Sequence, residues 1–448
     1  MKQQTDVLII GGGPAGVVSA GTAKRYYPGK KITLLKNVAD GCIPCGIPYM
    51  ISSLKDPAGN RMSTDALEKN GVTVSVDEAV SIDRSGKTVF TKNGDTIAYE
   101  KLILAVGSKP IIPPIPGIEK KGVYPVYKDM NYLLSAVDEF KKGKDVVVIG
   151  GGFIGVEFAD ELSRIPNLRV TLVEMCDRIL INSFDSEFSS LAEEKLRARG
   201  VRVLTKTAVQ EVMGGGRVEK IRLSSGETLD ADRVILGVGA SPLTDLACQA
   251  GLDLGKGKGI WVDEYMRTVD PDIYAVGDCA GKRDFYTRKD ASVMLASTAT
   301  AEARIAGANL YKLIVVRENK GTIAAYSTYV DGLVMGSAGL TECTARKENF
   351  EIVSGSAQAM DKHPGTLPGA QKTLVKLIFS KNSGIILGGQ AAGGISCGEL
   401  INVIGMAIQQ RVSCSELGTL QMATHPFLTP APTLYPVVTA AFDAAGKM

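Results

Sequence analysis

The sequence predicts an α/β protein with two parallel-sheet domains, followed by a separate α+β domain. The first observation is a repeat: an acidic residue, four β-prone apolar residues and a glycine cluster occur at 6–16 (DVLIIGGGPAG) and again at 145–155 (DVVVIGGGFIG). The second is that each block precedes another apolar strand, ITLL at 32–35 and VTLV at 170–173. The third is a change of pattern after about residue 323. Strand, glycine-opened helix and strand form a βαβ unit, so two such units predict two parallel sheets.

The segments after the first unit complete its domain and lead to the second. Short strands and turns alternate over 72–105 (VTVSV, KTVF, KLILAVG), and IIPPIPGI at 111–118 holds three prolines and reads as a linker. The second unit then runs to LGVG at 236–239, DIYAVGD at 272–278 is a further strand and turn, and 292–312 has an alanine-rich helical pattern.

The last part of the chain has a different composition of elements. Strand-like runs, KTLVKLIFS and GIILGGQAA, precede the helix candidate ELINVIGMAIQQ. Strands followed by a helix, without the βαβ alternation, predict an α+β domain.

Composition limits the classes of function. The chain has 448 residues, 45% hydrophobic and 22% charged, and a net charge of +3, which is too small to imply nucleic-acid binding. We find no secretory signal and no unbroken apolar run of 18 residues, so we expect no membrane span. Eight cysteines without a secretory signal indicate reduced thiols in a cytoplasmic protein.

Gly11, Gly13 and Gly16 follow the first strand with the spacing of a dinucleotide-binding loop, and Pro14 and Ala15 open the helix. The first glycine permits a tight turn, the second lets the backbone approach a pyrophosphate, and the third lets helix pack on strand. The helix start supplies free N–H groups and partial positive charge to the phosphates. The alternative is a structural glycine turn.

The second unit repeats this spacing with Gly150, Gly152 and Gly155, and Glu174 ends its next strand. A carboxylate there accepts hydrogen bonds from a ribose 2′-OH and repels a 2′-phosphate, so this site should prefer NADH over NADPH. Arg178 lies one turn away and could soften that preference. The alternative for Glu174 is a solvated strand end.

The first unit departs from the rule, because Lys36 stands where the acidic residue is expected. A lysine can donate a hydrogen bond to a ribose oxygen but cannot accept one. Asp40 is a candidate substitute.

Together, VLIIGGGPAG, KLILAVGSKP (101–110), VVVIGGGFIGVE and DIYAVGDCA resemble the FAD-dependent pyridine nucleotide–disulfide oxidoreductases, in that family's order. The resemblance implies an FAD-binding domain at 1–115 and 243–320, an NAD(P)H-binding domain at 116–242 and a dimerisation domain at 321–448. It also implies a homodimer or a dimer of dimers. Gly107 and Asp278 would contact FAD, Asp278 through the ribityl chain; alternatively Asp278 is a turn residue.

Within that family, CIPCGIPYM (42–50) resembles the branch of coenzyme A disulfide reductases, NADH oxidases and NAD(P)H-dependent persulfide or polysulfide reductases. That branch carries one redox cysteine, which Cys45 matches. Cys45 precedes GIPYMISSL, a segment that could open a helix, and a helix start lowers a thiol's pKa. The implied cycle passes hydride from NADH to FAD and then electrons to a disulfide or persulfide at Cys45. A buried structural thiol is the alternative.

Cys42 lies three residues before Cys45. The pair could form a redox disulfide or resolve a persulfide, but a spectator thiol is the favoured interpretation. Two cysteines without a second pair or a nearby histidine do not make a metal site.

Other positions follow from the resemblance. Phe153, with Ile154 beside it in GGGFIG, is expected to form an aromatic lid over the flavin, against a packed core role. Glu157 is expected near the nicotinamide, against a solvated helix position. His425 or its rival Tyr435 could reach the partner subunit's site, and histidine suits acid–base work because its pKa is near 6.5. Lys24, Arg25 and Arg61 match positions that bind coenzyme A phosphates, or are plain surface cations.

The preferred function is an NAD(P)H-dependent reductase of small disulfides, persulfides or polysulfide, with coenzyme A as a candidate thiol. The runner-up is an NADH oxidase that reduces oxygen through a cysteine sulfenic acid. A flavin-containing signalling protein is the alternative outside enzymes.

Overall fold

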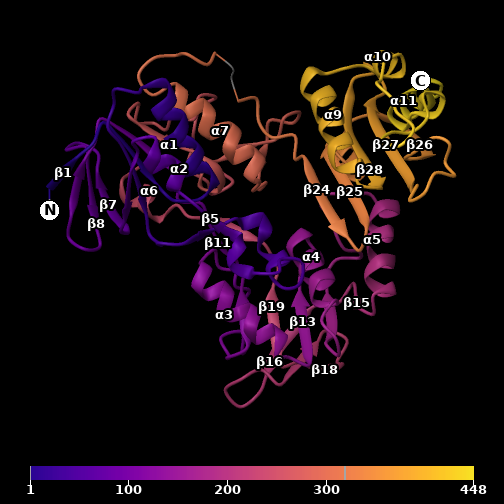
Figure 1. The fold of residues 1–448 in the computed structure, drawn as a ribbon, viewed down its shortest axis with the longest axis horizontal. Coiled ribbons are helices and arrows are strands. Elements are labelled where there is room, and N and C mark those ends of the chain that lie inside the picture. The colour runs from indigo at the N-terminus through magenta and orange to yellow at the C-terminus, as the bar shows by residue number, and fades with distance from the viewer. Residues whose placement is uncertain (1, 317–318) are drawn as a thin grey trace.

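The computed structural model describes residues 2–316 and 319–448. Figure 1 shows three lobes: an indigo N-terminal lobe to which the orange helix α7 returns, a magenta middle lobe, and an orange-to-yellow C-terminal lobe. The N-terminus lies at the far edge of the first lobe and the C-terminus in the third (Figure 1).

The first lobe is built on a parallel sheet with the strand order β21-β10-β2-β3-β6. Its central strands are buried along their length, as in sheets covered on both faces. Helix α1 packs beside α7 on one face, and the antiparallel sheet β1-β9-β8-β7 covers the other. The elements are β1 (Lys2–Gln4), β2 (Val7–Ile10), α1 (Pro14–Tyr26), β3 (Ile32–Lys36), α2 (Asp65–Lys69), β6 (Thr73–Val76), β7 (Ala79–Asp83), β8 (Thr88–Thr91), β9 (Thr96–Ala98), β10 (Lys101–Leu104), α6 (Asp245–Gln249), β21 (Ile273–Ala275) and α7 (Ala296–Ala308).

The middle lobe repeats this plan with the parallel order β12-β19-β13-β14-β15. The antiparallel sheet β16-β17-β18 packs on one face, and a two-stranded ladder, β11-β20, links the chain entering this lobe to the chain leaving it. The elements are β11 (Ser108–Pro110), β12 (Val123–Pro125), α3 (Met130–Lys141), β13 (Asp145–Ile149), α4 (Phe153–Leu162), β14 (Arg169–Val173), α5 (Ser186–Ala198), β15 (Arg202–Leu204), β16 (Val209–Met213), β17 (Lys220–Leu223), β18 (Thr228–Asp230), β19 (Arg233–Leu236) and β20 (Ala240–Pro242).

The C-terminal lobe is an antiparallel sheet of order β24-β25-β28-β27-β26 with helices packed on it, so the predicted α+β class is confirmed. The elements are β24 (Tyr326–Val330), β25 (Leu333–Gly339), α8 (Glu342–Lys347), β26 (Ile352–Met360), β27 (Lys372–Ser380), β28 (Ile386–Gly393), α9 (Cys397–Gln410), α10 (Cys414–Gly418), η5 (Pro432–Leu434) and α11 (Pro436–Ala445).

Short elements surround the predicted cofactor sites. The segment after β3 forms a two-stranded ladder and three turns of 3₁₀ helix, and a further 3₁₀ turn follows β21. These elements are β4 (Gly41–Cys42), η1 (Pro44–Gly46), η2 (Pro48–Met50), η3 (Pro57–Asn60), β5 (Arg61–Met62), η4 (Gly277–Cys279), β22 (Lys282–Arg283) and β23 (Asp290–Ala291). Across the described ranges, no helix combines the length and the apolar character that crossing a membrane requires.

Candidate functional site

The two glycine loops have the same backbone construction. Gly11 has φ +120° and Gly150 has φ +105°, values that side chains rarely adopt. A Cβ atom on Gly16 would lie 1.8 Å from the carbonyl oxygen of Gly11, and a Cβ on Gly155 would lie 1.8 Å from that of Gly150. Helix and loop therefore approach so closely in both units that only glycine fits at these four positions.

The middle glycine of each loop faces open space. Gly13 and Gly152 are the N-caps of α1 and α4, and no described atom lies within 4 Å of a Cβ built on either residue. Gly107, after β10, has φ +77° and is equally open. Each helix start thus presents N–H groups to a cradle that a side chain would fill, which fits the pyrophosphate of a dinucleotide.

Glu174 faces the second loop directly. Its carboxylate accepts hydrogen bonds from the backbone N–H of Gly151 (2.6 Å) and of Cys176 (2.7 Å). Arg178 lies nearby but its guanidinium is 3.4 Å from Asp177. The acidic strand end is therefore fixed against the glycine loop, where a ribose would approach it.

Lys36 occupies the matching place in the first loop with a different arrangement. The side chain is buried, and Nζ donates to the carbonyl oxygen of Ala39 at 2.8 Å. Its stem fills the space beside Gly12, where a Cβ would lie 2.9 Å from the lysine Cβ. Asp40 pairs instead with Arg61, 3.2 Å away.

Asp278 lies in η4 and draws together distant segments. Its carboxylate accepts a hydrogen bond from Ser108 (2.7 Å) and pairs with Lys128 (3.0 Å). Burial acts to raise the pKa of Asp278, but Lys128 and Ser108 outweigh it and hold that pKa below its usual value. Asp278 is therefore an anionic acceptor at the loop that ends the first sheet.

The two neighbouring cysteines have opposite exposure. Cys42 is buried on β4, and burial raises the pKa of its thiol to about 11. Cys45 is an exposed, free thiol in η1. A thiolate forms with more difficulty and reacts less readily at the buried position, so the geometry favours Cys45 as the reactive cysteine.

The expectation that the segment after Cys45, GIPYMISSL, opens an α-helix is wrong. Residues 44–50 form two short 3₁₀ turns, because Pro44 and Pro48 lack the N–H groups that an α-helix would use. The expected lowering of the Cys45 pKa is also wrong for the polypeptide. Although part of the Cys45 side chain is exposed, the protein atoms packed around it remove water from the thiol and raise that pKa, and the nearby carboxylates of Glu157 and Asp278 raise it further.

Three acidic side chains are buried on α4: Glu157, Asp160 and Glu161. Glu157 accepts hydrogen bonds from the hydroxyl of Thr328 (2.8 Å), on β24 of the C-terminal lobe, and from Tyr49 of η2. Burial raises the pKa of Glu157 to about 7, although both hydrogen bonds act to lower it. The predicted solvated alternative for Glu157 is therefore wrong, and this carboxyl can gain or lose a proton near neutral pH.

Phe153 begins α4 and is partly buried. Its ring stacks on Tyr326 of β24, with centroids 4.9 Å apart and an interplanar angle of 23°, and meets Phe184 edge-on at 6.0 Å. The first side chain of the second glycine loop is therefore held by an aromatic residue of the C-terminal lobe.

His425 and Tyr435 differ in accessibility. His425 is exposed and contacts its own loop: its N–H donates to Thr429 (3.0 Å) and its ring accepts from the N–H of Phe427 (3.3 Å). Tyr435 is buried at the start of α11, and burial raises the pKa of its phenol. Of the two, only His425 presents an accessible ring.

The three candidate phosphate-binding cations fall in two places. Lys24 and Arg25 lie in the last turn of α1, and the Lys24 ammonium donates to the carbonyl of Pro28. Arg61 lies on β5 directly opposite Cys42 in the β4-β5 ladder. Backbone pairing thus brings Arg61 to the cysteine segment.

Sequence patterns did not reveal several residues that complete these sites. Lys128 and Ser108 act on Asp278, Thr328 and Tyr49 on Glu157, and Tyr326 on Phe153. They belong to segments far apart in the chain and to no shared motif. Tyr49 and Ser108 alone carried a signal, since Tyr49 lies within the CIPCGIPYM motif and Ser108 within KLILAVGSKP.

Comparison with known proteins gives the same family at both ends of the chain. The family described as "Pyridine nucleotide-disulphide oxidoreductase" matches residues 5–303, and the dimerisation domain of that family matches residues 325–434.

Individual relatives cover nearly the whole chain. A protein named NADH oxidase from Methanocaldococcus jannaschii is 30% identical over 98% of this chain and 99% of its own length. An NAD(P)H coenzyme A polysulfide/persulfide reductase from Pyrococcus horikoshii is 31% identical, covering 86% of this chain and 87% of the relative.

A solved structure of an NAD-dependent persulfide reductase from A. fulgidus superposes with a TM-score of 0.91 at 31% identity, covering 100% of this chain and 83% of that one. A water-forming NADH oxidase from Lactobacillus brevis superposes with a TM-score of 0.90 at 26% identity, covering 99% and 98%. The predicted fold class, an enzyme activity and the pair of cofactors are confirmed by these matches. The chain belongs to the pyridine nucleotide-disulphide oxidoreductase family, and it is an oxidoreductase that uses FAD and a nicotinamide nucleotide.

Proposed function

We propose that this enzyme passes electrons from NADH through FAD to Cys45, and that Cys45 reduces a small disulfide, persulfide or polysulfide. One observation carries the proposal. The exposed thiol of Cys45 lies close enough to Glu157, on the helix of the second glycine loop, and to Asp278, beside the first, for both carboxylates to shift its pKa. This proximity supports a Cys45 sulfur that lies between the two proposed nucleotide sites.

The cofactor contacts follow from the loops. We assign FAD to residues 1–115 and 243–320, with Gly11, Gly13 and Gly16 at its pyrophosphate and Asp278 at its ribityl chain. We assign the nicotinamide nucleotide to residues 116–242, with the loop from Gly150 to Gly155 and Glu174. When bound, FAD accepts a hydride equivalent and releases two electrons to sulfur. At the helix starts, Pro14 and Ala15 are assigned to the FAD site and Ile154 to the nicotinamide nucleotide site. Lys36 and Gly107 are assigned to the FAD site as well.

The chain's own residues then handle sulfur and protons. The Cys45 thiolate forms an S–S bond with one sulfur of the substrate disulfide, and the other sulfur leaves as a thiolate. Two electrons that derive from NADH break the new bond, so the second thiol departs and the Cys45 thiolate returns. Glu157 can exchange protons beside Cys45 because its pKa is about 7. Phe153 acts as a lid that leaves Tyr326 when the nicotinamide binds.

Coenzyme A is the proposed thiol of the substrate, as the name of the Pyrococcus horikoshii relative suggests. Arg61, beside Cys42, would then meet a phosphate, with Lys24 and Arg25 as further phosphate contacts. Cys42 is proposed as a spectator because its thiol is buried.

The homodimer is a further proposal, supported by the matched dimerisation domain. The loop that carries His425 also exposes Phe427 (57%) and Leu428 (68%), as expected for a surface that a second copy covers. In such a dimer, His425 or the buried Tyr435 would approach the partner's cysteine. We place the enzyme in the cytoplasm, where its eight free cysteines stay reduced.

NADH oxidase activity is the second candidate function, favoured by the relatives of that name and by the exposure of Cys45, which admits oxidation to a sulfenic acid. The two functions separate in one assay on the purified holoenzyme. Rapid NADH oxidation by coenzyme A disulfide or polysulfide under argon supports the sulfur reductase, whereas oxidation that requires oxygen supports the oxidase.

Two cysteine variants test the route of the electrons. Cys45→Ser should abolish disulfide turnover while NADH still bleaches the flavin absorbance. Cys42→Ser is the matched control and should keep most of the activity. Retained turnover in Cys45→Ser would refute the role of Cys45, and an equal loss in Cys42→Ser would show that both cysteines react.

A further inference from the structure

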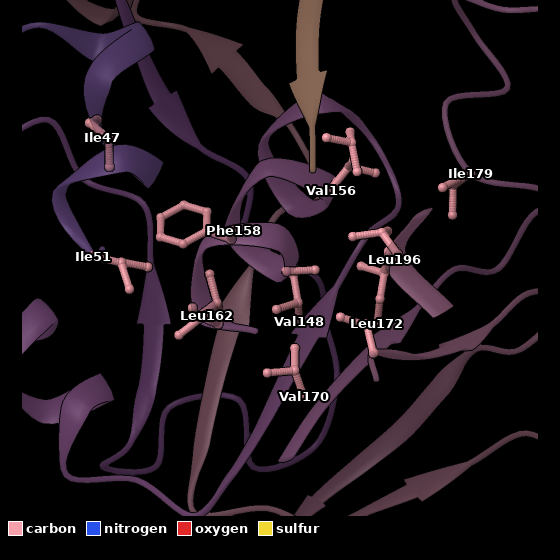
Figure 2. Close-up of a cluster of buried hydrophobic side chains, with 14 of the residues drawn as sticks. Ile47, Ile51, Val148, Val156, Phe158, Leu162, Val170, Leu172, Ile179 and Leu196 are labelled. Atoms are coloured by element: carbon pink, nitrogen blue, oxygen red, sulfur yellow. The ribbon is translucent and has the colours of Figure 1, made fainter. Parts of the chain in front are cut away.

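The segment that carries Cys45 packs on the middle lobe rather than on its own sheet. Ile47 and Ile51 are 3% and 2% exposed and belong to the same core as Phe158 and Leu162 of α4. Figure 2 shows the two isoleucines facing these two side chains. The helix that follows the second glycine loop is thus the platform for the cysteine segment.

Local structure alone holds this segment weakly. Ile43 is tied by its backbone N–H to the carbonyl of Asn60 (2.9 Å), but the backbone N–H groups of 46–51 make only the short-range bonds of 3₁₀ turns, for example from Ile47 to Pro44 (3.3 Å) and from Ile51 to Pro48 (3.3 Å). Such turns have poorer hydrogen-bond geometry than an α-helix and persist mainly where tertiary contacts fix them. The β4-β5 ladder and the bond from Ile43 to Asn60 fix the chain before Cys45, and the placement of the turns after it depends on what anchors the segment to α4.

Glu161 supplies that anchor. Its carboxylate accepts hydrogen bonds from the backbone N–H of Ser52 (3.2 Å), the backbone N–H of Ser53 (2.8 Å) and the hydroxyl of Ser53 (2.6 Å). The hydroxyl of Ser52 donates in turn to the backbone carbonyl of Glu161 (3.0 Å). Both directions of contact join the same two residues of the segment to the same residue of the helix.

Burial makes these contacts restrictive. Glu161 is 0% exposed, and its nearest cation, the Arg164 guanidinium, is 3.5 Å away. A buried carboxylate is costly unless hydrogen bonds satisfy it, so any shift of Ser52 and Ser53 would strand the charge. These hydrogen bonds therefore restrict the segment to one position on α4.

We propose that Glu161 is a positioning residue, which holds the Cys45 segment through Ser52 and Ser53 in the geometry that sulfur chemistry requires. The inference rests on the proposed redox role of Cys45, but the anchoring itself does not. Glu161 differs from Glu157, which faces Tyr49 and Thr328, because its partners are the residues that follow the cysteine turns.

The test uses the purified holoenzyme with Glu161→Ala, Glu161→Gln and Ser53→Ala. Asp160→Asn is the matched control, because Asp160 is also buried on α4 but pairs with Arg164 instead of the segment. Two quantities are measured: the rate at which iodoacetamide alkylates Cys45, followed by peptide mass spectrometry, and the two half-reactions of the flavin under argon. The half-reactions are reduction by NADH and re-oxidation by coenzyme A disulfide.

In Glu161→Ala, iodoacetamide should alkylate Cys45 several times faster than in wild type. Re-oxidation of the flavin by coenzyme A disulfide should slow about tenfold or more, because small misplacements of a reacting group are costly. The rate of flavin reduction by NADH should change less than about twofold, whereas a general loss of folding would slow this half-reaction too. Glu161→Gln should fall between Glu161→Ala and wild type, since its amide oxygen still accepts hydrogen bonds. Asp160→Asn should match wild type in both measurements.

Unchanged alkylation and re-oxidation in folded Glu161→Ala would overturn the proposal. If Glu161→Ala does not fold, Glu161→Gln and Ser53→Ala decide in its place: alkylation faster than in Asp160→Asn supports the anchor, and equal rates overturn it. If wild type shows no re-oxidation by disulfide, the proposed substrate is wrong, and the alkylation rates still decide the role of Glu161.

Discussion

The two glycine loops share one backbone and differ in the residues around it. In both, the outer glycines are fixed by close approach and the middle glycine faces open space. The strand ends differ: the carboxylate of Glu174 accepts from the N–H of Gly151 in its loop, while the ammonium of Lys36 donates to the carbonyl of Ala39. The common part fits the pyrophosphate that both cofactors contain, and the variable part lies at the strand ends beside the loops.

The helices that follow the loops diverge further. The buried face of α1 holds only small residues, which allows close packing against α7. The buried face of α4 includes three carboxyl groups, of which Glu157 and Glu161 contact the cysteine segment. The helix of the second βαβ unit therefore has a structural role beyond its glycine loop, because it also contacts the segment that carries Cys45.

The largest expected effect comes from the third glycines, where the two loops should fail in different ways. Gly16→Ala should yield a protein that purifies without flavin colour. Gly155→Ala should keep FAD but weaken NADH binding about 100-fold, because overpacking a tight contact costs about 3 kcal/mol. Absorbance spectra and NADH titrations distinguish them. Loss of FAD from Gly155→Ala would break the assignment of one cofactor to each loop.

The next effect concerns α4 alone and depends on pH. The folded protein raises the pKa of Glu157 from 4.5 to about 7, so the fold favours the protonated form. Stability from this group is full below pH 4.5 and is lost as pH rises towards 7. Glu157→Gln should therefore gain stability over wild type between pH 5 and pH 8, approaching about 3 kcal/mol.

Chemical denaturation of both proteins at several pH values checks this difference. A constant difference between Glu157→Gln and wild type across that range would show that Glu157 titrates normally.

A smaller effect is expected at the end of the second strand. Glu174→Ala should weaken NADH binding relative to NADPH by about tenfold, since a hydrogen bond to a charged group contributes about 1.5–3 kcal/mol. The ratio of the two dissociation constants is the measurement. Arg178→Ala should move that ratio the opposite way, and an unchanged ratio in Glu174→Ala would remove the ribose role.

The smallest effect is expected at the matching residue of the first loop. Lys36→Met keeps the buried stem and loses only the bond to Ala39, so FAD affinity should fall less than about tenfold. Titration of the apoprotein with FAD measures it. A loss near 100-fold would mean that the ammonium contacts FAD, and the contrast between the strand ends would disappear.

Short-range rules explain what could be predicted before the structure. Gly16 and Gly155 were predictable because the steric limits of a strand–loop–helix turn act within about ten residues and impose a fixed spacing of glycines in the sequence. The C-terminal α+β class was predictable from runs such as KTLVKLIFS. The turns at Cys45 were not predicted, although Pro44 and Pro48 carried the signal.

The sequence by itself determined two glycine-opened βαβ units, an acidic and a basic strand end, and the cysteine motif CIPCGIPYM. Tertiary structure decided what those groups meet: Lys128 beside Asp278, Thr328 on Glu157, and Ser52 and Ser53 on Glu161. The reason is physical. Backbone sterics and helix starts are local properties of a chain, whereas the burial and pKa of a side chain depend on partners that only folding brings near.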